Sequence, residues 1–185
     1  MKKLLLSLAA ALTAAIVAAG EIELVKATYG TGDRFADVTG AVRKNAVSIP
    51  GVLLAIPADN RLLGTDPAPH SCKRLTLIGK VDGREKRAVA VERQTCLLLA
   101  KDDPPSREFR LIGAYYGFGD RWNDVTEKLR SACVDVKVDN FNFGPDPASG
   151  KSKSLVVLYS RNHTFGIHRL KEREIYYRNF HQQQR

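Results

Sequence analysis

The fold is decided by a stretch that occurs twice, ATYGTGDRFADVT at residues 27–39 and AYYGFGDRWNDVT at residues 114–126. The two copies are identical at 9 of 13 positions. A second block follows each copy: its Asn, Gly-x-Asp-Pro-Ala, Lys-x-Leu and Glu-Arg positions lie in residues 60–93 and recur in residues 140–173. Two ordered blocks of identity do not arise by chance, so the sequence indicates an internal duplication.

The distance between the two blocks differs from one copy to the other. The first block recurs at an offset of 87 residues and the second at an offset of 80, so the first copy carries seven extra residues. We place them near Ser48–Leu54, where Pro50-Gly51 is a turn signal. The duplication predicts one domain at residues 21–100 and a second at residues 107–185. Residues 101–106 (KDDPPS) form the linker between them, which two prolines should stiffen.

Within each copy the local pattern is mostly that of β structure. Ile22 and Leu24 alternate with glutamates, and Asp82-Gly83 is a strong hairpin signal between two apolar strands. A short helix is expected after Asp37-Val-Thr and after Asp124-Val-Thr-Glu, which have the spacing of helix caps. The sequence therefore predicts a mainly β protein (α+β at most) with two tandem small β-sandwich or barrel-like domains, each with one short helix.

The first twenty residues have the pattern of a secretory signal peptide. Met1-Lys2-Lys3 supplies positive charge, residues 4–19 are apolar or small, and Val17-Ala18-Ala19 suits cleavage. An uncleaved membrane anchor is the alternative, although this run is shorter than the ~20 residues that usually span a bilayer. We therefore expect a secreted, periplasmic or cell-envelope protein.

The composition narrows the possible classes further. The 185 residues include 29 Lys and Arg against 20 Asp and Glu, for a net charge of +9, and 44% of them are hydrophobic. This composition excludes collagen-like, coiled-coil and polytopic membrane proteins. In an exported protein, a positive net charge favours anionic polysaccharides, lipid headgroups or acidic partners over nucleic acid.

The order of the repeated motifs resembles a known domain. The series A-x-Y-G-x-G-D-x-(F/W)-x-D-V-T, N-x-x-x-G-x-D-P-A and K-x-L is similar to the small C-terminal domain of the mitochondrial DnaJ-like proteins of subfamily C, member eleven, and to related repeats in secreted bacterial proteins. The resemblance implies a β-rich accessory module. The His-Pro-Asp signature of a J domain is absent, so the resemblance implies no chaperone activity and no catalytic residue.

The three cysteines fall unevenly over the two copies. Cys72 and Cys96 lie in the first copy, and both of their counterparts in the second copy, Ser152 and Tyr176, are other residues. Joint loss favours a disulfide between Cys72 and Cys96, with two unrelated buried thiols as the alternative. Cys133 is left without a partner, and we expect a buried apolar thiol or, less readily, an intermolecular bond.

No set of residues in the sequence predicts catalysis. The histidines lack a third converging group, no nucleophile motif is present, and neither a zinc nor a calcium spacing occurs. Recurring aspartates such as Asp33 and Asp120 are explained as turn or cap residues. We therefore expect no enzyme activity, no cofactor and no bound metal.

Aromatic residues are concentrated in the second copy, whose glycine-rich loop differs from that of the first. Tyr115, Phe118, Arg121 and Trp122 lie on or beside this loop, and aromatic rings there can stack on sugars or anchor a protein. The alternative is that the second copy only has a bulkier core. From these residues we predict a non-catalytic binding protein for a carbohydrate, an anionic polymer or a protein, with at most peripheral membrane contact and no nucleic acid. The second hypothesis is a structural subunit of an envelope or extracellular assembly, and a homo-oligomer of this chain is one form of such an assembly.

Overall fold

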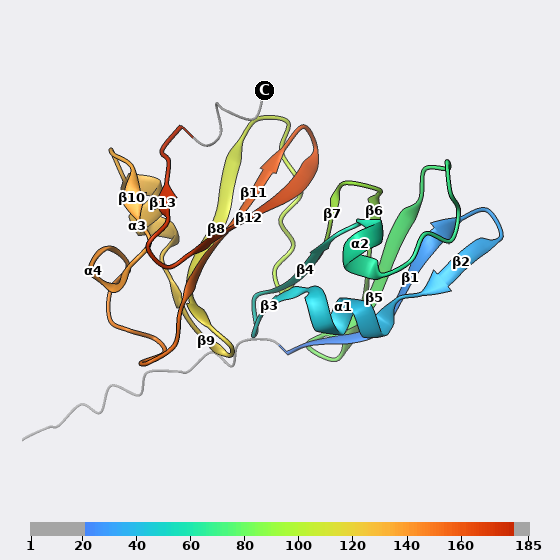
Figure 1. Ribbon diagram of the computed structural model, residues 1–185, viewed down its shortest axis with the longest axis horizontal. Helices are drawn as coiled ribbons and strands as arrows, with labels where there is room; N and C mark the ends of the chain where they lie inside the picture. The colour runs from blue at the N-terminus through green and yellow to red at the C-terminus, as the bar shows by residue number, and fades with distance from the viewer. Residues whose placement is uncertain (1–20, 180–185) are drawn as a thin grey trace, which may run out of the picture.

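The computed structural model describes residues 21–179, so the expected signal peptide at residues 1–20 and the end of the basic tail lie outside the described residues. The chain forms a mainly β, two-domain structure, whose two repeats lie next to each other along the long axis (Figure 1). The elements of repeat one are β1 (Ile22–Thr31), β2 (Arg34–Asp37), α1 (Thr39–Asn45), β3 (Val47–Ile49), β4 (Leu53–Pro57), α2 (Asn60–Leu63), β5 (Arg74–Val81), β6 (Arg84–Val91) and β7 (Thr95–Leu99). Those of repeat two are β8 (Arg110–Phe118), β9 (Arg121–Asp124), α3 (Thr126–Ser131), β10 (Val136–Lys137), α4 (Asn140–Phe143), β11 (Ser154–Arg161), β12 (Thr164–Lys171) and β13 (Ile175–Tyr176).

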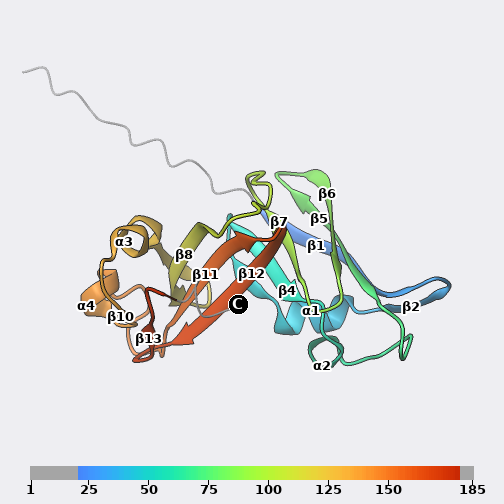
Figure 2. The ribbon, with the colours of Figure 1, turned by 90° about the horizontal axis from the view of Figure 1, so that it is seen from above.

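Repeat one is a sandwich of two antiparallel sheets. Sheet A has the strand order β2-β1-β5-β6, and sheet B has the order β3-β4-β7 (Figure 2). The core between them includes Tyr29, Leu75, Leu77 and Ile56, each of which is fully buried. The two-residue hairpin at Asp82-Gly83 joins β5 to β6, with a positive φ at both residues, as the sequence predicted.

Repeat two keeps the first of these sheets and loses most of the second. Sheet C, with the order β12-β11-β8-β9, corresponds to sheet A, and only the two-stranded pair β10–β13 stands where repeat one has sheet B. Tyr116, Phe143 and Leu155 fill the core beneath α3 and α4. The prediction of one short helix per domain is wrong, because Asp59 and Asp139 cap a second short helix in each repeat.

The seven extra residues of repeat one lie in the hairpin formed by β3 and β4. This hairpin and the longer β7 complete sheet B, which has one face against sheet A and the other against repeat two. The run Leu53–Ile56 is buried at every residue, because Leu54 and Ile56 point into repeat one whereas Leu53 and Ala55 point toward repeat two. A strand that is covered on both faces requires such a continuous apolar run.

The opposing surface of repeat two is the outer face of sheet C. Val156 and Leu158 of β11 join Ile49, Leu53 and Leu97 of repeat one in one buried cluster, which we call the inter-repeat cluster. Full burial of a side chain of this size contributes roughly 1.5–3 kcal/mol. The two repeats are therefore joined by a shared apolar layer, and not only by the linker.

The linker itself is held against repeat two. Arg110 forms an ion pair with Asp103 and donates a hydrogen bond to the carbonyl oxygen of Pro104 at 2.8 Å. Among residues 21–179, no helix is long and apolar enough to cross a membrane.

Candidate functional site

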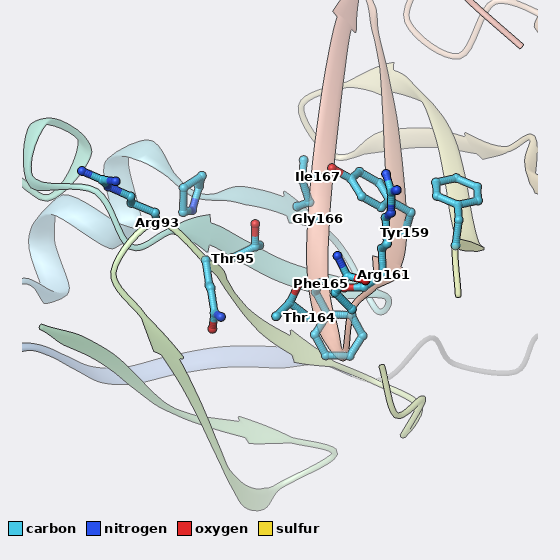
Figure 3. Close-up of a pocket in the computed structure, with 12 residues that line it drawn as sticks. Arg93, Thr95, Tyr159, Arg161, Thr164, Phe165, Gly166 and Ile167 are labelled. Atoms are coloured by element: carbon cyan, nitrogen blue, oxygen red, sulfur yellow. Dashed lines mark hydrogen bonds between the residues drawn. The ribbon is translucent and has the colours of Figure 1, made fainter. Parts of the chain in front are cut away.

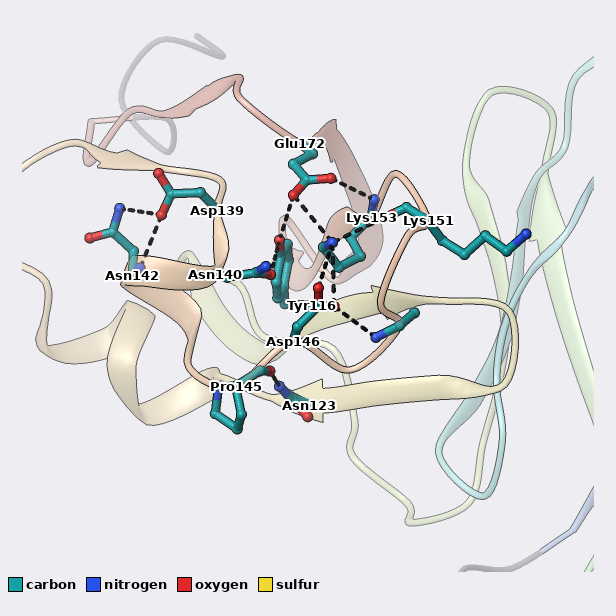
Figure 4. Close-up of polar contacts among 11 residues, drawn as sticks. Tyr116, Asn123, Asp139, Asn140, Asn142, Pro145, Asp146, Lys151, Lys153 and Glu172 are labelled. Carbon is teal, nitrogen blue, oxygen red and sulfur yellow. Dashed lines mark hydrogen bonds and ion pairs between the residues drawn. The ribbon is translucent and has the colours of Figure 1, made fainter.

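A buried cluster of ionisable groups is the most conspicuous polar feature of repeat two (Figure 4). The ammonium of Lys153, on a residue only 4% exposed, lies 3.3 Å from carboxylate oxygens of both Asp146 and Glu172. The hydroxyl of Tyr116 donates to Asn140 at 2.9 Å. Such a cluster is a possible catalytic site, so its counterpart in repeat one is informative.

Repeat one contains the same cluster with nearly the same geometry. Lys73 lies 3.1 Å from Asp66 and 3.2 Å from Glu92, and Tyr29 donates to Asn60 at 2.8 Å. Burial opposes the charged form of Lys73, but the two carboxylates outweigh that effect and raise its pKa. Lys73 links the loop before β5 to the turn after β6, and Lys153 links the loop before β11 to the turn after β12. The recurring residues of the cluster therefore have a structural role.

The repeated Asp-Val-Thr motif is also explained by structure. The hydroxyl oxygens of Thr39 and Thr126 accept hydrogen bonds at 2.9 Å from the backbone N–H groups of Ala27 and Ala114. Asp37 accepts a hydrogen bond from the N–H of Thr39 at 2.8 Å, and the equivalent bond exists in repeat two. The motif therefore fastens the short helix to the first long strand of each repeat.

The structure separates the four residues that the sequence proposed as a binding site. Tyr115 and Trp122 are partly buried and pack against the inter-repeat cluster, and the indole N–H of Trp122 donates to the carbonyl oxygen of Gly119 at 2.8 Å. Burial raises the pKa of Tyr115 to about 12. Phe118 and Arg121 are exposed at the β8–β9 turn. The expected open aromatic surface is therefore not assembled, because repeat one covers half of it.

The expected Cys72–Cys96 disulfide is not present, and all three cysteines are free thiols. Cys96 points into the core of repeat one, 3.6 Å from the carbonyl oxygen of Leu75. Cys72 is exposed and lines the outer side of sheet A, so the sheet lies between the two sulfurs. The expectation of a buried Cys133 is also wrong, because this thiol is exposed in the loop after α3.

A wide, shallow hollow lies on repeat one, on the outer side of sheet A. The hollow has a volume of about 1180 Å³, and we call the surface that lines it the open face. Its outward side chains come from β1, β2, β5 and β6 and include Lys26, Thr28, Phe35, Arg74, Thr76, Ile78, Glu85, Arg87 and Val89.

Strand register arranges these side chains in rows. Lys26, Ile78 and Arg87 lie abreast on three neighbouring strands. The next row contains Thr28, Thr76 and Val89, and the row after it contains Phe35, Gly30, Arg74 and Val91. Outward residues on one strand are two positions apart, so the outer rows are separated by about 14 Å.

The open face is the counterpart of the surface that repeat two buries. Thr28, Thr76, Glu85 and Arg87 occupy the positions that Tyr115, Val156, Phe165 and Ile167 have in sheet C. These four residues of repeat two lie in or against the inter-repeat cluster, whereas their four counterparts in repeat one are polar or charged. Sequence reasoning missed this site, although the alternation on β5 and β6 was visible.

The described residues 21–179 contain no group of three or more His, Cys, Asp or Glu side chains that could hold a metal ion. No protein-family model, no curated protein and no solved structure matches the chain. The resemblance to the DnaJ-like C-terminal domain stays a prediction from sequence.

Proposed function

We propose that the protein is an exported, non-catalytic binding protein that holds an acidic polysaccharide on the open face of repeat one. The observation that carries this proposal is the difference in residue type between the equivalent outer faces of sheet A and sheet C. Tyr115, Val156 and Ile167, which are covered on sheet C, have the counterparts Thr28, Thr76 and Arg87 where sheet A is open. A face that only had to be soluble would need no excess of one charge, whereas this one has such an excess.

The charge of the open face favours an anionic ligand. Lys26, Arg74 and Arg87 are exposed along it, against a single carboxylate from Glu85. Arginine binds carboxylate and sulfate groups through two parallel hydrogen bonds, which gives both affinity and orientation. A hollow with an excess of one sign of charge also raises the local concentration of oppositely charged ligands.

The uncharged groups on the same face suit a sugar. The hydroxyls of Thr28 and Thr76 lie between the two basic rows and can both donate and accept hydrogen bonds. The ring of Phe35 is 54% exposed at the edge of the face, where it can stack on the apolar side of a sugar ring. With about 14 Å between the basic rows, a polymer can contact both at once, but a single sugar ring cannot.

The test is binding of the mature chain to immobilised polygalacturonate and heparin. The triple variant K26Q/R74Q/R87Q should bind at least 10-fold more weakly than the wild-type chain, because three hydrogen-bonded charge contacts are lost. All three residues are exposed, so the thermal unfolding temperature should be unchanged.

A matched control removes the same charge from elsewhere. The variant K44Q/R84Q/R121Q replaces three exposed cations that do not line the open face. It should retain most of the wild-type affinity. Equal weakening in both variants would show that only the net charge matters, and the open face would then not be the binding site.

A second candidate function, a subunit of a larger assembly, is favoured by the far end of repeat two. Phe141 is 94% and Val134 69% exposed there, and Val134 follows Cys133, whose thiol is exposed. Size-exclusion chromatography with and without reductant tests it: a monomer under both conditions removes self-assembly.

A further inference from the structure

The outermost strand of sheet C has one edge with which no other strand of the described chain pairs. Sheet C ends at β12, which pairs only with β11, in continuous register over its whole length. An edge strand of this kind leaves a row of backbone N–H and C=O groups without strand partners. The edge strand on the other side of sheet C, β9, has only four residues. We call the long unpaired edge of repeat two the β12 edge.

The turn between β11 and β12 fixes which backbone groups face outward. Both turn residues have a positive φ, as in a two-residue hairpin, so the backbone of Thr164 is bonded to β11. Inward and outward backbone groups alternate along an edge strand. The N–H and C=O groups of Phe165, Ile167 and Arg169 therefore face away from β11.

Contacts at the end of β12 agree with this orientation. The outward N–H of Lys171 donates to the carboxylate of Glu174 at 2.7 Å, and its C=O accepts from the N–H of Glu174 at 3.1 Å. The N–H of Glu172 instead donates to the C=O of Lys153, next to β11, at 2.9 Å. One outward N–H of the β12 edge thus already binds a carboxylate. Within residues 21–179, the three outward positions before it have no such partner.

The equivalent edge of repeat one is protected against strand pairing. β6 begins with REKR at residues 84–87, where β12 has TFGI at residues 164–167. Charged residues on an edge strand, lysine above all, oppose the addition of another strand. The ammonium of Lys86 also donates to the C=O of Leu99 on β7 at 2.9 Å. Its counterpart Gly166 has no side chain, so the β12 edge lacks this protection.

A groove between the two repeats runs along the β12 edge. It has a volume of about 420 Å³, and we call it the inter-repeat groove. Gly166 and Ile167 lie on the strand of the hairpin nearer to Thr95 of repeat one (Figure 3). The lining comes from both faces of β12: Phe165 and Ile167 face repeat one, and Thr164 and Gly166 are on the other face. A groove that follows a strand edge has such a lining, since successive side chains alternate between faces.

The charge along the β12 edge favours an acidic ligand. None of the twelve described residues that line the groove is acidic, and β12 itself contains no carboxylate. Arg169 is exposed, and its Nε donates to the hydroxyl of Ser154 at 3.3 Å. It forms no ion pair within the described residues. Opposite charges directly across a strand pair stabilise it, so a ligand residue opposite Arg169 should be acidic.

We propose that the β12 edge binds an extended acidic peptide of a partner protein by strand addition. The peptide adds a fifth, antiparallel strand to sheet C, with backbone hydrogen bonds to Phe165, Ile167 and Arg169. Its carboxylate lies opposite Arg169, and an apolar side chain lies opposite Ile167. From Phe165 to Arg169 the strand is about 14 Å long, which five peptide residues span. These residues are not part of the open face, so the proposal does not depend on polysaccharide binding.

NMR titration of the isotope-labelled mature chain with acetyl-Glu-Thr-Val-Thr-Val-amide tests the proposal. Antiparallel pairing places Glu opposite Arg169 and the central Val opposite Ile167, and the backbone amide signals of both residues should shift saturably. N-methylation of the central Val removes a hydrogen bond to β12 and should weaken binding roughly 5-fold or more. N-methylation of the first Thr, whose N–H points away from β12, should change the affinity less than about 2-fold.

An exchange of charges tests the place of the acidic residue. The variant R169E should bind this peptide roughly 5-fold more weakly, because attraction across the strand pair becomes repulsion. It should prefer the same peptide with Lys in place of Glu. The variant R84E changes the net charge equally, on the equivalent hairpin of repeat one, and should bind as the wild-type chain does. The variant K26Q/R74Q/R87Q should also keep peptide binding, even if polysaccharide binding fails.

Three results would each overturn the proposal. They are no shift of these amide signals in the folded wild-type chain, equal weakening by the two N-methylations, and equal loss in R84E and R169E. Self-association of the chain through β12 without peptide would also overturn it, because a second copy would then cover the β12 edge.

Discussion

Phe35 and Trp122 occupy equivalent positions in the two repeats, and only Trp122 is covered. Trp122 packs against the inter-repeat cluster, whereas Phe35 is 54% exposed on the open face. The difference follows from the β3–β4 hairpin, which gives repeat one a surface that covers sheet C. Within the described residues, the β10–β13 pair of repeat two lies on the side away from repeat one (Figure 1), so it does not cover sheet A.

This pair gives the first prediction. Trp122→Ala should lower the free energy of unfolding by about 2 kcal/mol, less than a fully buried ring because Trp122 is only partly buried. Phe35→Ala should change it by no more than about 0.5 kcal/mol. Urea unfolding followed by circular dichroism measures both, and similar costs would contradict the assigned packing.

The glycine before each β-turn gives a second matched pair. A Cβ at Gly117 would lie 2.1 Å from the carbonyl oxygen of Arg121, and at Gly30 2.0 Å from that of Arg34, whereas at Gly40 it would meet nothing within 4 Å. Gly117→Ala should therefore cost more than about 2 kcal/mol, since backbone must shift. Gly40→Ala, in helix α1, should be neutral or stabilise by up to about 1 kcal/mol. A tolerated Gly117→Ala would rule out this turn geometry.

The buried lysine cluster predicts a loss of stability in acid. The backbone N–H of Ala148 and the ion pair with Lys153 lower the pKa of Asp146 below its ordinary value of 3.8. Burial works against the charged form of Glu172, but hydrogen bonds from Lys153 outweigh it and lower its pKa below 4.5. Both carboxylates therefore stabilise the fold above these ordinary values, and this contribution is lost as the pH falls through the lowered pKa values.

Thermal unfolding between pH 7 and pH 3 measures this effect. The wild-type chain should lose stability mainly below about pH 4.5, and Glu172→Gln should make the acid limb shallower because one titrating group is gone. The control Glu108→Gln changes an exposed carboxyl and should leave the limb unchanged. An unchanged limb in Glu172→Gln would show that the cluster does not set the acid stability.

The cysteines predict unequal reactivity. Burial raises the pKa of the Cys96 thiol to about 12, so it should react with iodoacetamide only after unfolding. Cys72 and Cys133 are exposed and should react in the native protein. Mass spectrometry of the native chain should therefore show two modifications. Protection of both Cys72 and Cys96, released by reductant, would restore the disulfide that the sequence suggested.

Much of the fold follows from the sequence because local signals repeat. The two-residue turn at Asp82-Gly83, the short helix after Asp37-Val-Thr and the extra residues near Ser48–Leu54 were all predicted from spacing and turn chemistry. The second helix in each repeat was missed, because it has only four residues and too little periodicity to detect.

The candidate site could not be predicted in the same way, because it depends on which sheet face is covered. That is decided by packing between segments far apart in sequence, such as Leu53 against Val156 and Leu158. One signal did exist: Leu155–Leu158 is continuously apolar, whereas the equivalent Leu75–Ile78 contains Thr76. The first pattern is typical of a strand covered on both faces, and the second of a strand open on one.

The salt dependence of binding to polygalacturonate tests the central claim most directly. Each cation that neutralises a charge on a polyanion releases a counterion, and for nucleic acids each contact adds roughly 0.7–0.9 to the slope of log affinity against log salt. For K26Q/R74Q/R87Q we predict a slope shallower by about 2, and for K44Q/R84Q/R121Q a slope close to that of the wild-type chain. The same slope in all three proteins, or no binding by the folded wild-type chain, would contradict the assignment of the open face as a polysaccharide site.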